Sequence, residues 1–298
     1  MMTFAITDTH CDVLWKMWEH KLETFSEHSE LTVTPEKLKK GGVKKQVFAI
    51  FDPVFLGHSD GWPIIKKQLE LFQNTIATNQ TLADEQITPL LSLEGAMSLG
   101  DDEKRWERLY DSNIIMASLT WNEKNELATG CKEDPTEGLT EKGRLQVKRL
   151  FARDIALDVS HLNEQGFWDV LALEGRVLAS HSNARALCDH PRNLRNEQIQ
   201  ALAEKQGFIG LVWHPLFLNG SEEAACDDIG RHIDHVAGLG GKELIGFGSD
   251  FDGTTLAVTG LEDPSGYCNL IEWLIKRYKE EDVRAFTSQN FERFLNNG

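Results

Sequence analysis

Eight short apolar stretches alternate with helical patterns along this chain, and no other feature constrains its fold as strongly. The stretches cover residues 4–7, 43–51, 88–93, 114–119, 155–159, 176–179, 208–212 and 244–247. Strands that alternate with helices form a parallel sheet. Eight such strands, rather than a smaller number, favour a closed (β/α)8 TIM barrel over an open doubly wound sheet.

The segments between these stretches have the periodicity of amphipathic helices. Apolar residues recur every three or four positions, which places them on one helix face. Helices are predicted over 62–81, 140–153, 163–173, 195–205 and 227–239, and a helical hairpin broken near 280–282 is predicted over 269–295. No repeat, linker or low-complexity segment divides the chain. We therefore predict one domain over residues 1–298, with a C-terminal helical extension.

Charge and composition exclude several classes of protein. The net charge of -16 would repel the phosphates of nucleic acid. No apolar run approaches the roughly 18 residues of a membrane span, and the first residues lack the pattern of a signal peptide. The five cysteines are odd in number and scattered, so no disulfide framework is expected. A reducing cytoplasm is the expected compartment.

His10 and Asp12 follow the first apolar stretch and are two positions apart. Positions i and i+2 of an extended strand point to the same side, so an imidazole and a carboxylate would project together. Such a pair can bind a divalent metal, although this spacing also arises by chance. Cys11 lies on the opposite face, where burial is expected.

Four more potential ligands follow other apolar stretches. They are Glu94, His161, His181 and Asp250. A single Glu or His at such a position is more often a cap or a satisfied polar group, but six such residues in one chain make coincidence improbable. In a barrel the carboxyl ends of the strands meet at one mouth. Two metals bridged by one carboxylate need about this many ligands.

The fourth stretch is not followed by the lysine that bridges two metals in many barrel hydrolases, because the nearest lysine is Lys124. Glu94 is then the expected bridge. His232 and His235 lie three positions apart on a predicted helix, where an exposed helix face is the preferred interpretation. No partner is expected for His190.

Four motifs in order resemble the renal or membrane dipeptidase family, zinc metallopeptidases of the amidohydrolase superfamily. They are the segments 92–96 (SLEGA), 158–161 (DVSH), 179–185 (ASHSNAR) followed by Arg192 and Asn193, and 246–253 (GFGSDFDG). The resemblance implies that His10 and Asp12 bind one zinc, that His161 and His181 bind the other, and that Glu94 bridges them. It further implies that Asp250, close to the first metal, is the acid/base and that Arg192 holds the carboxylate of the substrate.

The resemblance implies a binuclear-zinc dipeptidase in which a hydroxide between the two ions attacks the peptide bond. Its substrates would be dipeptides, including those with a C-terminal D-residue, and other divalent ions could replace zinc. Relatives are often homodimers. The alternatives are a barrel hydrolase of another amide or a lactone, and a metal-binding relative without peptidase activity. Arg192 favours the dipeptidase over the lactone hydrolase, because a neutral lactone offers no carboxylate to a guanidinium.

One position departs from the family pattern. The family commonly has a histidine two residues after the end of strand four, and this chain has Trp121. An indole donates one hydrogen bond but carries no charge. His214 follows the seventh apolar stretch and faces the same mouth. We therefore expect Trp121 to contact the substrate and His214 to take over part of the missing imidazole's work, with a plain loop histidine as the competing interpretation.

Overall fold

Eight parallel strands close into a barrel in this computed structural model, which describes residues 4–296. The strands are β1 (Ile6–Asp8), β2 (Val43–Phe51), β3 (Thr88–Glu94), β4 (Met116–Ala117), β5 (Ala156–Asp158), β6 (Val177–Ala179), β7 (Phe208–Leu211) and β8 (Ile245–Phe247). Each predicted apolar stretch overlaps one of them, and β1 and β3 extend one residue beyond the predicted end. The predicted (β/α)8 TIM barrel is confirmed.

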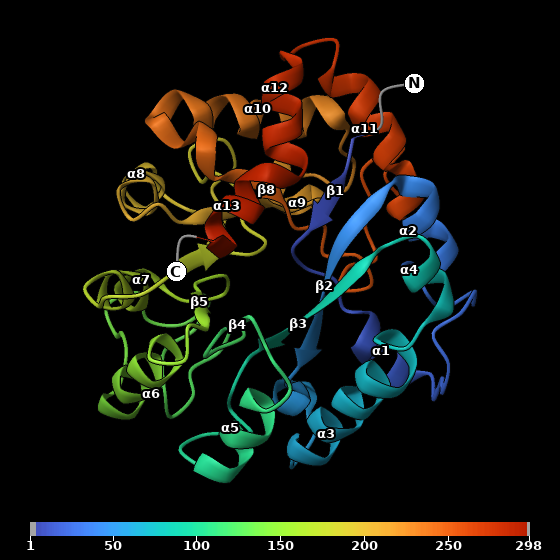
Figure 1. The fold of residues 1–298 in the computed structure, drawn as a ribbon. Helices are drawn as coiled ribbons and strands as arrows, with labels where there is room; N and C mark the ends of the chain where they lie inside the picture. The colour runs from blue at the N-terminus through green and yellow to red at the C-terminus, as the bar shows by residue number, and fades with distance from the viewer. Residues whose placement is uncertain (1–3, 297–298) are drawn as a thin grey trace.

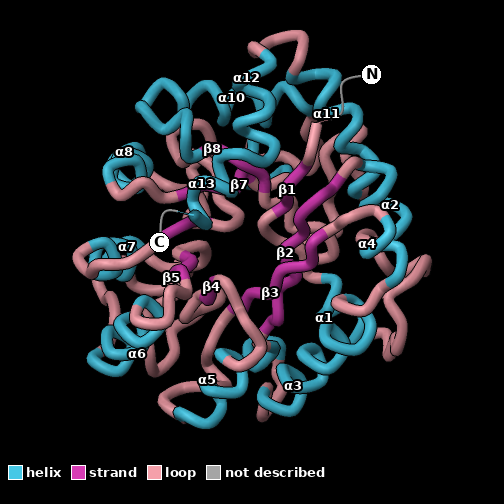
Figure 2. Tube along the Cα trace, viewed as in Figure 1, coloured by secondary structure: helices cyan, strands magenta, loops and turns pink. Residues whose placement is uncertain are grey.

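Helices surround the strands (Figure 1) and form an outer ring in which helix and loop alternate (Figure 2). They are α1 (Val13–Glu19), α2 (Pro35–Gly41), α3 (Trp62–Leu71), α4 (Gln80–Asp84), α5 (Glu103–Tyr110), α6 (Glu141–Phe151), α7 (Glu164–Leu171), α8 (Asn196–Glu204), α9 (Pro215–Leu218), α10 (Cys226–Val236), α11 (Tyr267–Leu274), α12 (Glu280–Arg284) and α13 (Asn290–Asn296). The predicted helices of 140–153, 163–173 and 195–205 correspond to α6, α7 and α8.

Three details of the helix prediction were wrong. The helix predicted over 62–81 is interrupted, because a π-helical turn at Phe72–Ile76 follows α3 and α4 starts afresh at Gln80. The C-terminal break lies at 275–279 rather than at 280–282. Glu280, Glu281 and Asp282 instead form the first turn of α12, where negative charge complements the positive end of the helix dipole. Helices α1, α2 and α5 were not predicted.

The interior of the barrel is filled by a small apolar cluster that includes the last helix. Its strand residues are Val47, Met116, Ala156, Leu178 and Phe208, and α13 adds Phe291 and Phe294. The ring centroids of Phe208 and Phe291 are 4.9 Å apart. Gly246 of β8 makes room for Phe208, because a Cβ there would lie 2.3 Å from its ring. Helix α13 therefore packs over the barrel floor (Figure 1).

Two expectations about membranes and cysteines can be compared with this fold. Within residues 4–296, no helix is both long enough and apolar enough to cross a bilayer. The five cysteines are free thiols. Cys11 is fully buried, as predicted, and its Sγ donates to the carbonyl oxygen of Val47 over 3.4 Å.

His232 of α10 was predicted on an exposed helix face, and that prediction was wrong. Its side chain is fully buried. Its Nδ1 accepts from the backbone N–H of Ala184 over 3.1 Å, and its Nε2 donates to the carbonyl oxygen of Leu218 over 2.8 Å. These two bonds tie α10 to the loop after β6 and to α9. Helical periodicity cannot reveal them, because both partners are backbone groups of other segments, one in a loop and one at the end of α9.

We predict that His232 makes folding less favourable in acid. Burial lowers its pKa from 6.5 to about 4, so the unfolded chain binds more protons than the native chain between these values. The free energy of unfolding should therefore fall by about 3 kcal/mol from this group as the pH drops from 6.5 towards 4. Denaturant melts of wild type and His232→Gln across this range measure the difference. Parallel pH profiles for the two proteins would contradict the prediction.

Candidate metal centre

The six predicted metal ligands meet at the carboxyl-terminal mouth of the barrel. His10 and Asp12 follow β1, Glu94 ends β3, and His161, His181 and Asp250 come from the loops directly after β5, β6 and β8. The Nε2 of His10 lies 3.4 Å from Asp12 Oδ2, 3.4 Å from Glu94 Oε2 and 3.7 Å from Asp250 Oδ1. The three carboxylates therefore form one cluster around the imidazole of His10.

Glu94 connects that cluster to a second one. Its other oxygen, Oε1, lies 3.0 Å from Nε2 of His161 and 3.7 Å from Nε2 of His181. The two oxygens of one carboxylate thus face different histidines. This is the geometry expected of a bridging ligand, and the metal-binding roles remain predictions.

The backbone holds these ligands by pairing that continues beyond the strands. The amide of Asp250 donates to the carbonyl of His10 over 3.2 Å, and the amide of Asp12 donates to the carbonyl of Phe251 over 2.9 Å. Both His161 (φ 71°) and Asp250 (φ 65°) adopt left-handed backbone conformations. Residues other than glycine rarely do so, and such strain concentrates at functional sites.

The ring nitrogens of His161 and His181 have a defined protonation pattern. Nδ1 of His161 lies 2.9 Å from Oδ1 of Asn122, which can only accept, so Nδ1 carries the proton. Nδ1 of His181 lies 2.7 Å from the Ser180 hydroxyl, which itself donates to Asp158 over 2.5 Å. Nδ1 of His181 is therefore also the donor. Both Nε2 atoms are left with bare lone pairs.

These lone pairs provide a test of whether a metal fits. The two Nε2 atoms are only 3.0 Å apart, and lone pairs at this distance repel each other. Nε2 of His10 is buried without a hydrogen-bond partner among the described residues. Metal-bound histidines characteristically donate their other ring N–H to a fixed acceptor. The residues therefore fit divalent cations, which would bind the lone pairs of these nitrogens.

The carboxylates also favour a cation. Burial raises the pKa of Asp12, and the charge of Glu94 raises it further. Burial and the charge of Asp12 raise the pKa of Asp250 well above its usual range. Buried like charges are costly without a counter-charge, and divalent ions supply one.

A cavity of about 460 Å³ lies over the cluster, and Arg192, Trp121 and His214 all line it. Arg192 is 5% exposed. Its guanidinium donates to the carbonyl of His181 over 3.1 Å and to the Ser182 hydroxyl over 3.4 Å, while its Nε has no hydrogen-bond partner in the part of the chain that the structure describes. No carboxylate among residues 4–296 lies within 4.0 Å of it. A buried guanidinium in this state is suited to an incoming anion.

Trp121 and His214 have different neighbours in the cavity. The Trp121 ring meets Phe51 edge-on at 5.6 Å and is tilted against His161 at 6.1 Å. His214 stacks on Phe217 at 4.2 Å, and no hydrogen bond or ion pair in the described chain links it to the six ligands. Burial, with the charges of His190 and Arg192, lowers the pKa of His214 to about 4. Its proposed catalytic part remains a prediction.

Several residues of the site were missed from sequence. Asn122, Ser180 and Asp158 orient the two histidines. Ser180 and Asp158 lie one and three positions before the ligands His181 and His161, and Asn122 follows Trp121 after the fourth apolar stretch. His190, for which no partner was expected, also lines the cavity. Its Nδ1 accepts from the backbone N–H of Arg192 over 3.2 Å. Its position two residues before Arg192 was the available signal.

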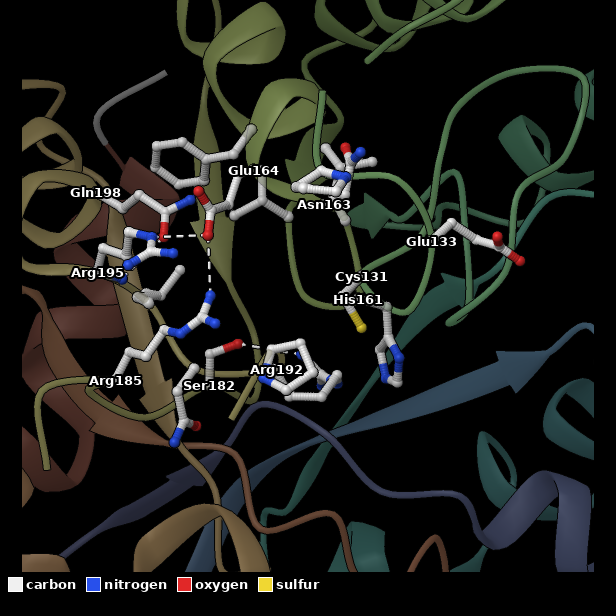
Figure 3. A pocket seen from close by; sticks show the side chains of 17 residues that line it. Cys131, Glu133, His161, Asn163, Glu164, Ser182, Arg185, Arg192, Arg195 and Gln198 are labelled. Carbon is white, nitrogen blue, oxygen red and sulfur yellow. Dashed lines mark hydrogen bonds and ion pairs between the residues drawn. The ribbon is translucent and has the colours of Figure 1, made fainter. Parts of the chain in front are cut away.

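A second cavity, of about 270 Å³, is also lined by Arg192 and His161 (Figure 3). Glu164 points towards both Arg185 and Arg195 there, with ion-pair distances of 2.9 and 2.7 Å. These pairs join α7 to the loop of residues 182–195. They therefore help to fix the loop that carries Arg192.

A histidine and carboxylate cluster at the mouth of an eight-stranded barrel defines the class of barrel metallohydrolases. Within this class, the model of the membrane dipeptidase family, peptidase family M19, matches residues 1–297. The chain belongs to this family of dipeptidases, and the resemblance inferred from its motifs is confirmed. It is accordingly a metal-dependent hydrolase.

Individual relatives agree with this assignment. Dipeptidase aclJ of Aspergillus oryzae is 32% identical over 218 residues, which are 70% of this chain and 51% of that protein. The structure of dipeptidase AC, a metallopeptidase of family M19, has a TM-score of 0.90 at 25% identity over 99% of this chain and 98% of its own. A metallopeptidase from Rhodobacter sphaeroides, liganded with a phosphinate mimic of L-Ala-D-Ala, has a TM-score of 0.87 at 26% identity over 99% of both chains.

We predict that Asn122 sets metal affinity through His161. Asn122→Leu removes the acceptor of the His161 proton, so metal affinity should fall by about 10- to 100-fold. Asn122→Asp keeps an acceptor at this position and should retain most of the affinity. Competition with a chelator of known affinity measures both variants. Wild-type affinity in Asn122→Leu would show that the hydrogen bond does not orient the ligand.

Proposed function

We propose that this protein is a binuclear-zinc dipeptidase that cleaves short dipeptides, including those with a C-terminal D-residue. The proposal depends on one observation: two features occur in the same cavity. They are Glu94, whose two oxygens face two sets of histidines, and the buried guanidinium of Arg192. The D-residue is supported by the Rhodobacter sphaeroides relative, whose ligand mimics L-Ala-D-Ala. Other divalent ions could replace zinc in such a site.

His10, Asp12 and Glu94 would hold one ion, and Glu94, His161 and His181 would hold the other. The ions would acidify water near neutral pH and polarise the peptide carbonyl. Asp250 contributes a carboxylate 3.7 Å from His10, where it would hold the proton of the attacking water and pass it to the departing amine.

Arg192 would select the length of the substrate. Its planar guanidinium is suited to a carboxylate, and its burial makes that contact strong. In a dipeptide the C-terminal carboxylate lies one residue from the scissile bond. A longer chain carries a neutral peptide group at that position, which would leave the guanidinium buried without a counter-charge.

Two other functions fit these observations less well. A hydrolase of lactones or neutral cyclic amides would have no use for Arg192. A relative without catalysis would not need six converging ligands together with a free guanidinium in the same cavity. Both are distinguished from a dipeptidase by direct assay.

We predict that the zinc-loaded protein releases free amino acids from L,L- and L,D-dipeptides. Elemental analysis of gently purified protein should approach two divalent ions per chain. Glu94→Ala should lower occupancy of both positions together and abolish turnover, because one carboxylate serves both ions. Full metal content and activity in this variant would refute the bridge, and a protein inert to all dipeptides would refute the function.

We predict that Arg192→Ala lowers kcat/KM for dipeptides, because it removes a desolvated charge pair. The loss should correspond to about 2–4 kcal/mol of transition-state stabilisation. Amidating the C-terminus of the dipeptide should harm wild type much more than the variant. Arg149→Ala is the control, since Arg149 of α6 pairs with Glu103 of α5 and does not line the cavity. Equal losses on amidation in wild type and Arg192→Ala would rule out a direct carboxylate contact.

A further inference from the structure

Side chains of both charges line the cavity over the centre. Asp12, Glu94 and Asp250 come from the ends of β1, β3 and β8. Arg192 and Lys132 come from the loops after β6 and β4, and Lys16, which also lines the cavity, is paired with Glu19. The first set is accounted for by the proposed metals and Arg192 by the substrate carboxylate. Lys132 has no part in that scheme.

The backbone around Lys132 is held against the centre. The amide of Lys132 donates to the carbonyl of Asn122 over 3.0 Å, and the amide of Cys131 donates to the carbonyl of His161 over 2.8 Å. Gly130 forms an isolated bridge with Leu162. The Lys132 Nζ lies 5.8 Å from the centroid of the Trp121 ring, a favourable position for a cation. The exposed ammonium group therefore lies at the cavity wall beside Trp121.

Lys132 carries its charge without an ion pair. No carboxylate within residues 4–296 lies within 4.0 Å of its Nζ, whereas Lys124 in the same loop pairs with Glu137. Glu123 is a neighbour that interacts with Lys132 only at longer range: burial raises the pKa of its carboxyl, and Lys132 offsets this in part. This wall of the cavity therefore has a positive charge available to a ligand.

Lys132 and Arg192 both lie near the ring of His190. Burial lowers the pKa of His190, and the charges of Arg192 and Lys132 lower it further, so both cations lie near this ring. His190 and Trp121 line the same cavity as the two cations. A substrate residue whose α-carboxylate is held by Arg192 would therefore have its side chain within the influence of Lys132.

We propose that Lys132 determines specificity by binding a side-chain carboxylate of the C-terminal residue. This inference rests on the proposed dipeptidase function. The substrates favoured by this chain are dipeptides that end in an aspartate-like or glutamate-like residue and so present two carboxylates, one to Arg192 and one to Lys132. An uncharged side chain of the same shape lacks the attraction that the unpaired ammonium supplies.

The test compares isosteric substrates that differ in one charge. The zinc-loaded protein is assayed with L-alanyl-aspartate and L-alanyl-asparagine, each with an L or a D second residue. Wild type should prefer the aspartyl substrate by about two- to five-fold in kcat/KM, as expected for one solvent-exposed charge pair. Lys132→Met should abolish the preference by lowering the aspartyl rate to that of the asparaginyl substrate. High salt should reduce the preference in wild type.

Lys124→Met is the matched control, because it removes the same charge from the same loop outside the cavity. It should keep the wild-type preference. Cleavage of both substrates at equal rates by wild type, or an undiminished aspartyl preference in Lys132→Met, would overturn the role of Lys132 while leaving the dipeptidase intact. Cleavage of neither substrate, nor of any other dipeptide, would overturn the proposed function and this inference together.

Discussion

The pairing of β1 with β8 is the constraint on which the rest of this structure depends. Only a short register joins the two strands, with Asp8 opposite Phe247. The buried Asp8 carboxylate strengthens it by accepting from the backbone N–H and the hydroxyl of Ser249 over 2.9 and 2.6 Å. This contact closes the barrel, and it also brings His10 and Asp12 beside Asp250, although about 240 positions separate them in the chain. Closure of the fold and assembly of the centre are the same event.

The polar interior carries a cost that the fold must offset. Asp8, Asp158 and Ser180 are buried beneath the centre, yet each makes hydrogen bonds that satisfy its polar atoms. Buried polar groups are tolerated when their bonds are complete, and such networks are rigid. The ligands that point outward from this layer are therefore oriented before any ion or substrate arrives. Rigid orientation of this kind is what a metal site or a catalytic site requires.

The architecture and the candidate ligands could be predicted from sequence for one physical reason. Buried parallel strands are continuous apolar runs, and polar residues directly after them, such as Glu94 and His181, stand out. The breaks in the helices did not show, because the π-helical turn after α3 keeps the same apolar composition. His232 was misjudged because its partners are backbone groups of two other segments, the loop after β6 and the end of α9. The proton positions on His161 and His181 depend on Asn122 and Ser180, and only three-dimensional proximity reveals these contacts.

The packing of α13 over the barrel floor has a consequence for how the protein is made. Phe291 and Phe294 complete the apolar cluster inside the barrel, next to Phe208. Until residue 294 has left the ribosome, the growing chain exposes part of that cluster, because the two phenylalanines of α13 do not yet cover it. Contacts between distant parts of a chain also form slowly, because loop closure costs entropy before it is rewarded. Nascent chains of this protein therefore pass through a long stage in which the barrel is open at one end and the apolar floor is available to chaperones.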